Sequence, residues 1–277
     1  MLELELLPDL PAATEIGVFD SGVGGLSVLR ELHALLPDVG LHYVADAAYA
    51  PYGQRSPDEI RQRSEQIAEH LIEAGAKLIV VACNTATAHA IEALRARWPR
   101  VPFVGTEPGI KPAVSATRNG RIGVLATAAT AASSRYQALV ARHGQGAEVF
   151  TQACPGVVDL IEAGQLDAPE LRALVARYTA PLREAQVDTV LLGCTHYPFI
   201  EALWHEALGP EIQLLRIETA VARRAAGLWR HEHPQDHTHT LPQAPLLVET
   251  SGNAEALGQW MARVLGWGQV EVRHWAP

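Results

Sequence analysis

The fold is decided by two stretches of the chain, AKLIVVACNT at residues 76–85 and VDTVLLGCTH at residues 187–196. Each contains a run of aliphatic and β-branched residues, which is the pattern of a strand buried on both faces of a parallel sheet. Each then reaches a cysteine, Cys83 or Cys194, that is followed by small hydroxyl or amide residues. We expect both thiols at the carboxyl ends of strands, where open α/β sheets bind ligands. Two thiols offered in this way could attack one substrate from two sides.

Strand-like and helix-like segments alternate along most of the chain. The expected strands, besides those ending at the two cysteines, are 15–19, 41–45, 101–105 and 120–125. The expected helices are 26–36, 57–74, 86–98, 131–143 and 169–185, with Ser56 as a candidate N-cap of the second. This alternation predicts right-handed βαβ units and therefore an α/β protein built on parallel sheets.

The two cysteine segments lie 111 positions apart (194 − 83), which is too far for a solenoid repeat. We therefore expect two similar parallel-sheet α/β domains that face each other across a central cleft. Pro, Gly, Ser and Asn gather at 108–118, where we place one boundary. We expect the C-terminal part, with a last strand near 269–274, to complete the first domain. The predicted domains are 1–110 with 215–277, on the Cys83 side, and 111–214, on the Cys194 side.

The composition indicates a cytoplasmic globular protein. Hydrophobic residues make up 48% and charged residues 19% of the 277 residues, and no apolar run approaches the roughly 20 residues of a membrane helix. The first five residues, MLELE, are acidic where a signal peptide is basic. Three widely spaced cysteines favour reduced thiols. The net charge of −9 argues against nucleic acid or an anionic membrane as a partner, but not against a small anionic substrate.

A glycine-rich loop, FDSGVGG at residues 19–25, follows the first expected strand. Its backbone amides could approach a ligand closely, and Asp46 lies at about the distance of a ribose-binding acid. A dinucleotide site is therefore one interpretation, although the third glycine of that fingerprint would fall on Ser27. A structural turn without a ligand is the other.

Histidines suggest two further sites. His196 follows Cys194 by two residues, so on a continuing strand both side chains would share a face and could form a Cys-His pair for acyl transfer. A histidine in such a place more often only satisfies hydrogen bonds. The run HEHPQDHTH at 231–239 could bind metal adventitiously, but its spacing favours a solvated loop. Cys154 lacks the setting of the other two thiols, and we interpret it as structural.

Four ordered motifs carry a resemblance to a known family: FDSGVGG at 19–25, APYG at 50–53, ACNTA at 82–86 and GCTHYP at 193–198. With these motifs the chain resembles the cofactor-independent aspartate/glutamate racemases, and glutamate racemases in particular. The resemblance implies two α/β domains with the active site in the cleft between them. It also implies interconversion of L- and D-glutamate for peptidoglycan synthesis, and a homodimer.

The resemblance also implies roles for individual residues. Cys83 and Cys194 correspond to the two acid/base groups, Cys83 acting on the α-proton of D-glutamate and Cys194 on that of L-glutamate. Asp20 and His196 are candidates for tuning or orienting the thiols, and Glu162 resembles a family carboxylate near the second thiol. The positions that match substrate-binding residues are Asp20, Ser21, Pro51, Tyr52, Gly53, Asn84, Thr85, Thr127, Thr195 and His196.

The chemistry of the residues agrees with this interpretation. Inversion of an α-carbon without a cofactor needs one group that removes a proton on one face and another that returns a proton on the other. Two thiols can do this, and a helix N-terminus after each would lower its pKa. No lysine occurs in the four motifs, which counts against a pyridoxal-phosphate Schiff base, and we predict neither cofactor nor metal.

Three alternatives remain open from the sequence. A racemase for aspartate or another amino acid would keep both thiols and change only the pocket. A decarboxylase of related fold needs one proton donor, so the second cysteine disfavours it. A non-catalytic module that binds glutamate or a nucleotide would tolerate serine at both thiol positions.

Overall fold

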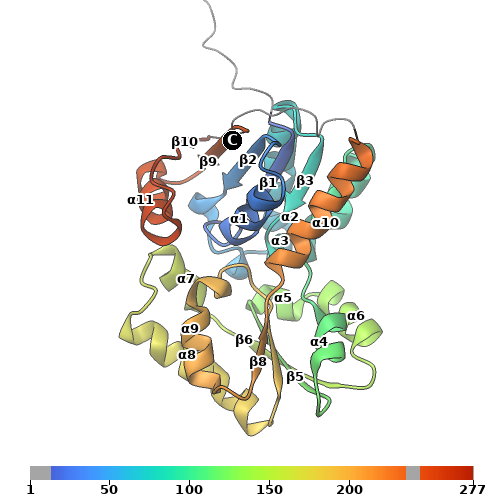
Figure 1. Ribbon diagram of the computed structural model, residues 1–277, viewed down its shortest axis with the longest axis vertical. Helices are drawn as coiled ribbons and strands as arrows, with labels where there is room; N and C mark the ends of the chain where they lie inside the picture. The colour runs from blue at the N-terminus through green and yellow to red at the C-terminus, as the bar shows by residue number, and fades with distance from the viewer. Residues whose placement is uncertain (1–13, 235–243, 277) are drawn as a thin grey trace, which may run out of the picture.

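The computed structural model describes residues 14–234 and 244–276, in which ten strands form two parallel sheets. The first sheet has the order β10 (Val272–His274), β9 (Leu246–Thr250), β2 (Leu41–Ala45), β1 (Ile16–Asp20), β3 (Leu78–Val81) and β4 (Phe103–Gly105). The second has the order β6 (Glu148–Ala153), β5 (Arg121–Ala126), β7 (Thr189–Leu192) and β8 (Gln213–Leu215). Figure 1 shows the second sheet below the first. The predicted α/β class with two parallel sheets is confirmed.

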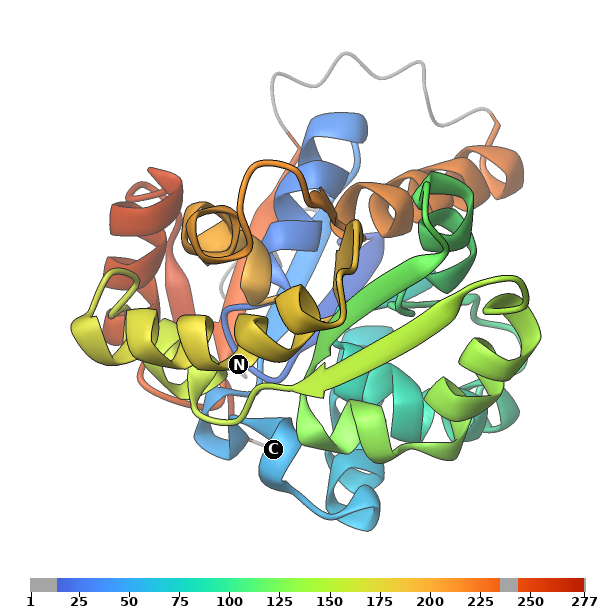
Figure 2. The same cartoon turned by 90° about the horizontal axis from the view of Figure 1, so that it is seen from below.

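Helices cover both faces of each sheet (Figures 1 and 2). On the first sheet, one face packs against α1 (Leu26–Leu35), α10 (Glu218–Glu232) and α11 (Ala254–Leu265), and the other against α2 (Pro57–Glu73) and α3 (Asn84–Arg97). On the second, one face packs against α7 (Val157–Glu162), α8 (Pro169–Glu184) and α9 (Glu201–Leu208), and the other against α4 (Ile110–Ala116) and α6 (Ser134–His143). Strands buried on both faces need continuous apolar runs, which explains why the sequence pattern identified β3 and β7 so clearly.

The two halves of the molecule share a hydrophobic core. One cluster of buried residues contains Val18 and Val80 of the first sheet together with Val190 and Leu192 of the second. Trp204 of α9 belongs to the same cluster and is fully buried. Because this core continues from one sheet to the other, the cleft between the halves is closed on one side by packed side chains.

Local capping explains where several helices begin. Ser56 accepts a hydrogen bond from the amide of Glu59, whose carboxylate accepts one from the amide of Ser56, and Pro57 stands at the first helical position. This capping box fixes the start of α2 as predicted. Gly75, with φ of +105°, follows its end and adopts a left-handed conformation that favours glycine.

Other elements differ from the sequence prediction. The expected helix 131–143 is two helices, α5 (Ala128–Ala132) and α6, because the hydroxyls of Thr127 and Ser133 each accept an amide hydrogen bond and cap a separate helix. The expected linker 108–118 contains α4. Leu215, where the C-terminal segment was predicted to begin, is the last residue of β8. The sequence analysis did not identify β6, β8 or β9, which carry fewer buried residues than β1 or β3.

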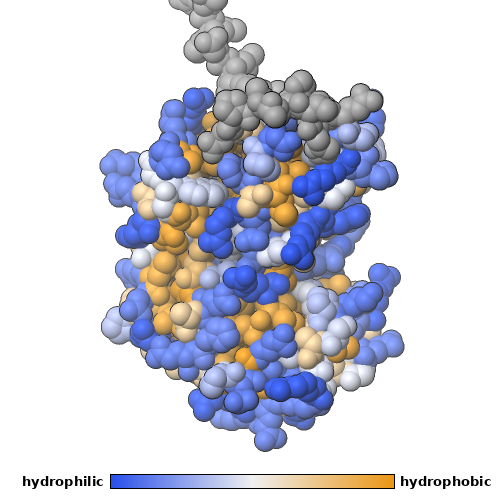
Figure 3. Space-filling view, in the orientation of Figure 1, coloured by the Kyte–Doolittle hydropathy of each residue, from blue (hydrophilic) through white to orange (hydrophobic). Residues whose placement is uncertain are grey.

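Hydrophilic residues cover much of the face drawn in Figure 3, and hydrophobic residues show between them on the side of α7 and α11. Among the described residues no helix is long and apolar enough to cross a membrane. His231 belongs to the end of α10, and the part of the predicted histidine-rich loop from residue 235 onward lies outside the described residues.

Candidate active site

The carboxyl ends of β1, β3, β5 and β7 lead into segments that line one cavity between the two halves. Eleven of the predicted site residues line it: Ser21, Pro51, Tyr52, Gly53, Cys83, Asn84, Thr85, Thr127, Cys194, Thr195 and His196. Val158 of α7 completes the lining, and no sequence signal distinguished this aliphatic residue. The cavity is narrow, because the volume accessible to water is only about 10 Å³. That is room for about one water molecule.

Cys83 caps the N-terminus of α3. Its sulfur accepts a hydrogen bond from the amide of Ala86 at 3.4 Å, and its thiol lies 3.8 Å from the hydroxyl of Ser21. Burial and the carboxylate of Asp20 nevertheless raise the pKa of the Cys83 thiol well above its usual value, against the weaker effect of the Ala86 amide. The amide at the helix N-terminus does lower the pKa of Cys83, as predicted, but burial and Asp20 outweigh it, so the net shift is upward.

Asp20, the last residue of β1, lies behind the cavity wall and is fully buried. One of its carboxylate oxygens accepts hydrogen bonds from the amides of Gly22 and Gly25, at 3.2 and 3.0 Å. A side chain at Gly25 would collide with Asp20, so the loop needs glycine there. Burial raises the pKa of Asp20 more than the nearby His196 lowers it.

The glycine-rich loop therefore binds a carboxylate of its own chain. This contradicts the dinucleotide interpretation, because the amides that would hold a pyrophosphate donate to Asp20. Asp46, the candidate ribose acid, is also engaged within the protein. It accepts hydrogen bonds from the hydroxyl of Tyr52 at 2.6 Å and from the guanidinium of Arg63 at 2.7 and 2.9 Å, and it thereby holds the loop that carries Tyr52 against the cavity.

Cys194 begins a chain of polar contacts in the second half. Its sulfur lies 3.7 Å from Nδ1 of His196, whose Nε2 lies 2.5 Å from a carboxylate oxygen of Glu162. Burial disfavours the imidazolium, but the contacts with Cys194 and Glu162 outweigh burial and raise the pKa of His196 well above its usual value. The same oxygen of Glu162 accepts a hydrogen bond from the amide of Val23 at 2.9 Å, so this chain of contacts also ties the second half to the glycine-rich loop.

Hydroxyl groups join the two halves at the opposite wall of the cavity. The hydroxyls of Thr85, from α3, and Thr127, from the end of β5, lie 2.9 Å apart. Thr127 in turn donates to Thr130 at 2.9 Å. The backbone at Gly53 approaches Thr127 so closely that an added Cβ would lie 3.1 Å from the threonine Cβ. These small side chains bring hydroxyl oxygens from both halves to the cavity lining.

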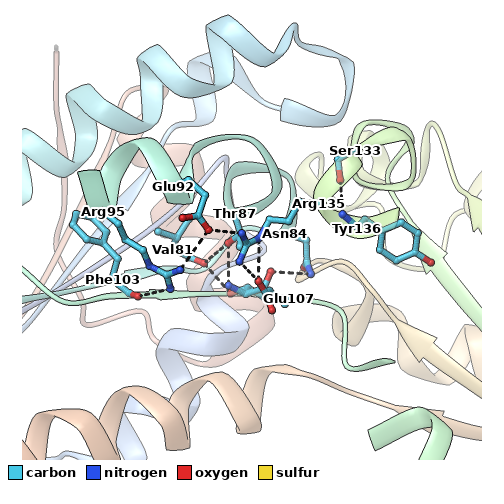
Figure 4. A network of polar contacts seen from close by, with 11 residues as sticks. Val81, Asn84, Thr87, Glu92, Arg95, Phe103, Glu107, Ser133, Arg135 and Tyr136 are labelled. Atoms are coloured by element: carbon cyan, nitrogen blue, oxygen red, sulfur yellow. Dashed lines mark hydrogen bonds and ion pairs between the residues drawn. The ribbon is translucent and has the colours of Figure 1, made fainter. Parts of the chain in front are cut away.

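The side chain of Asn84 is positioned by a network of polar contacts, shown in Figure 4. Its amide nitrogen donates to the carbonyl of Thr106 at 3.3 Å, and the Thr106 amide donates to Thr87 at 2.9 Å. Farther along this interface, Arg135 of α6 pairs with Glu107 and with Glu92 of α3. Within the described part of the chain, Oδ1 of Asn84 is buried without a hydrogen-bond partner. This oxygen is available to accept a hydrogen bond from a ligand.

The comparisons with known proteins agree with this geometry. The family model for Asp/Glu/Hydantoin racemases matches residues 16–225. The chain belongs to this family. It is therefore an isomerase, a racemase, and the decarboxylase and binding-module alternatives give way to this assignment.

Individual relatives of the racemase are glutamate racemases. It is 54% identical to the glutamate racemase of Pseudomonas aeruginosa over 209 residues, which cover 76% of this chain and 79% of the relative. The crystal structure of glutamate racemase RacE1 from Bacillus anthracis superposes with a TM-score of 0.86 at 30% identity, covering 95% of this chain and 97% of that one. The Escherichia coli glutamate racemase, in complex with L-glutamate and the activator UDP-MurNAc-Ala, gives a TM-score of 0.81 at 32% identity, with 95% and 98% covered.

Replacement of Asp20 tests the electrostatic setting of the first thiol. Asp20→Asn removes a negative charge that opposes the Cys83 thiolate, so the pKa of Cys83 should fall. The pH dependence of iodoacetamide labelling at Cys83, followed by mass spectrometry in a Cys194→Ser background, should shift to lower pH. The exposed carboxylate of Asp159 supplies the control, Asp159→Asn, which should leave the curve in place. A curve that stays unchanged or moves to higher pH in Asp20→Asn would contradict this setting.

Replacement of Glu162 tests the electrostatic setting of the second thiol, Cys194, through its neighbour His196. Glu162→Gln removes the carboxylate that favours the His196 imidazolium, so the pKa of His196 should fall. The measurement is an NMR titration of the histidine ring C–H signals. Glu201→Gln is the matched control, because Glu201 pairs with the half-exposed His205 at 3.8 Å and should leave His196 unaffected. An unchanged His196 titration in Glu162→Gln would show that Glu162 does not set its charge.

Proposed function

We propose that this racemase interconverts L- and D-glutamate by two-base proton transfer between Cys83 and Cys194. The observation that carries the proposal is that thiols from two different sheets line one small cavity. A single thiol would suffice to exchange an α-proton with solvent, whereas inversion is direct when a second acid stands on the other face. The glutamate racemases among the relatives, and L-glutamate in the Escherichia coli structure, support glutamate as the substrate.

The two thiols have different electrostatic settings, and this suits opposite starting states. We assign removal of the α-proton of L-glutamate to Cys194, whose sulfur lies 3.7 Å from Nδ1 of His196, a ring with a pKa raised well above its usual value. The raised pKa of Cys83 favours a thiol, which would deliver its proton to the opposite face. The reaction leaves Cys194 protonated and Cys83 ionised. The same two groups, with their roles exchanged, convert D-glutamate to L-glutamate.

The cavity wall offers partners for the rest of the amino acid. Removal of the α-proton places negative charge next to the α-carboxylate, and hydroxyl donors at Ser21 and Thr195 can stabilise it. The unpartnered Oδ1 of Asn84 would accept a hydrogen bond from the substrate ammonium. The neighbouring Asp20, buried behind the wall, adds negative charge that attracts the same ammonium. These groups bind an α-amino acid without a cofactor.

The volume of the cavity implies that the two halves move apart to admit substrate. Space for about one water molecule does not hold a glutamate, so binding of this substrate requires the cavity to widen. We propose that the moving bodies are close to the predicted domains, 1–110 with 215–277 and 111–214, except that Ile110 of α4 and Leu215 of β8 belong to the second body. The pairing of β9 with β2 supports the return of the C-terminal segment to the first body.

We further propose that the enzyme works in the cytoplasm as a homodimer and supplies D-glutamate for peptidoglycan. Three free cysteines, all buried, suit a reducing compartment. An aspartate racemase would use the same two thiols, so aspartate is the second substrate to test. Compared with aspartate, glutamate has a longer side chain, which the widened cavity has to accommodate.

Replacement of each thiol tests the proposal. In deuterated buffer without added cofactor, the native enzyme should remove the α-proton NMR signal of L-glutamate while the optical activity decays. Cys83→Ser and Cys194→Ser should each lower the racemisation rate by at least roughly 10²-fold, the lower end of the usual contribution of general acid–base catalysis.

Cys154→Ala supplies the matched control. Cys154 is buried outside the cavity lining, and burial raises its pKa to about 12, so this variant should keep its activity. Racemisation that survives in either Cys83→Ser or Cys194→Ser would contradict the two-thiol mechanism. A native enzyme that acts on aspartate and not on glutamate would overturn the substrate assignment.

A further inference from the structure

Three metal-ligating side chains meet on the face of the first sheet that α2 covers, away from the cavity. His42 lies on β2 and Glu249 on the neighbouring strand β9. The register pairs Glu249 with Val44, which is two residues from His42 and therefore on the same face of β2, so the side chains of His42 and Glu249 project from one face of the sheet. His70, in the last turn of α2, reaches the same point from above the sheet. None of the three lines the cavity between the halves.

The three side chains converge on one carboxylate oxygen. Oε2 of Glu249 lies 2.8 Å from Nε2 of His42 and 2.6 Å from Nε2 of His70. One ligand atom from each residue lies within 4.8 Å of the others. The side chain of His42 is only 1% exposed, but those of Glu249 and His70 are 15% and 28% exposed, so the cluster opens toward solvent on one side.

We propose that these residues bind a divalent transition-metal cation, with Zn²⁺ as the representative ion. Two imidazole nitrogens and one carboxylate oxygen form a three-ligand set that zinc sites use, and a water molecule on the open side would complete a tetrahedron. Imidazole ligation favours zinc, copper or nickel over magnesium or calcium.

The charges around the cluster suit a cation. The acidic member of the cluster is Glu249, whose carboxylate faces the His42 and His70 rings at 2.8 and 2.6 Å. The neighbouring cation, Arg63, is paired with Asp46 by two hydrogen bonds of 2.7 and 2.9 Å. A metal ion would bind where the two Nε2 atoms now approach the same carboxylate oxygen.

Binding would join three separate segments of the first half of the molecule. β9 lies near the end of the sequence, whereas β2 and α2 lie near its start. The cation would link side chains of all three elements. Trp275 stacks on His70 with ring centroids 5.0 Å apart, so the C-terminal end of the described chain also packs against the site. The expected role is stabilisation of the folded chain, because a cation that binds only the folded state raises the unfolding temperature.

Zinc titration of the full chain tests the proposal. Other histidines and thiols would also take up zinc, so the background variant carries Cys83→Ser and Cys194→Ser, and asparagine in place of His231, His233, His237 and His239. Its zinc binding is measured by competition with a chromophoric chelator, and its unfolding temperature is compared with and without Zn²⁺. We expect one equivalent of zinc and a higher unfolding temperature.

Single replacements in this background locate the ion. His70→Asn and Glu249→Gln should each weaken zinc binding by more than the roughly 10- to 100-fold that loss of an outer-shell partner costs. His205→Asn, a half-exposed histidine on α9, is the matched control and should change neither readout. Circular dichroism with a chelator present checks that each variant is folded. No uptake by the background variant, or uptake that both replacements retain, would overturn the proposal.

Discussion

The active site depends on one constraint, that the parallel strands of two sheets direct their carboxyl ends into the same cavity. Cys83 follows β3 of the first sheet and Cys194 follows β7 of the second, so the two thiols reach one cavity from different halves of the chain. Each is held at a strand end by a strand buried on both faces, which fixes its position far better than a surface loop would. This arrangement is the basis of the proposed two-sided reaction at one carbon atom.

The second feature is the electrostatic difference between the thiols. A buried carboxylate, Asp20, lies near Cys83, whereas the His196 imidazole with its Glu162 partner stands beside Cys194. The first setting raises the pKa of the Cys83 thiol, and in the second the contacts of His196 raise the pKa of its ring, so the two thiols stand in unlike surroundings. The Val23 amide that binds Glu162 makes the second setting depend on contact between the halves.

The sequence predicted much of the fold and most of the cavity lining, because strand-end motifs are local patterns. It could not predict the pKa of Cys83, since burial and the carboxylate of Asp20 act through the folded structure. The sequence did not indicate that Val158 lines the cavity, because an aliphatic side chain on a helix has no pattern that distinguishes it from a core residue. The His42, His70 and Glu249 cluster was equally hidden, because its members come from three segments that only the sheet and α2 bring together. The division of helix 131–143 depended on which hydroxyl groups cap which helix.

The transfer of hydrogen at the α-carbon tests the central claim most directly. L-glutamate labelled with deuterium at the α-carbon is converted in ordinary water, and the isotope content of substrate and product is measured at low conversion. Two bases on opposite faces predict D-glutamate that carries hydrogen from the solvent, while the remaining L-glutamate keeps its deuterium. D-glutamate that retains a substantial share of the original deuterium would indicate one base acting on both faces, and would contradict the account.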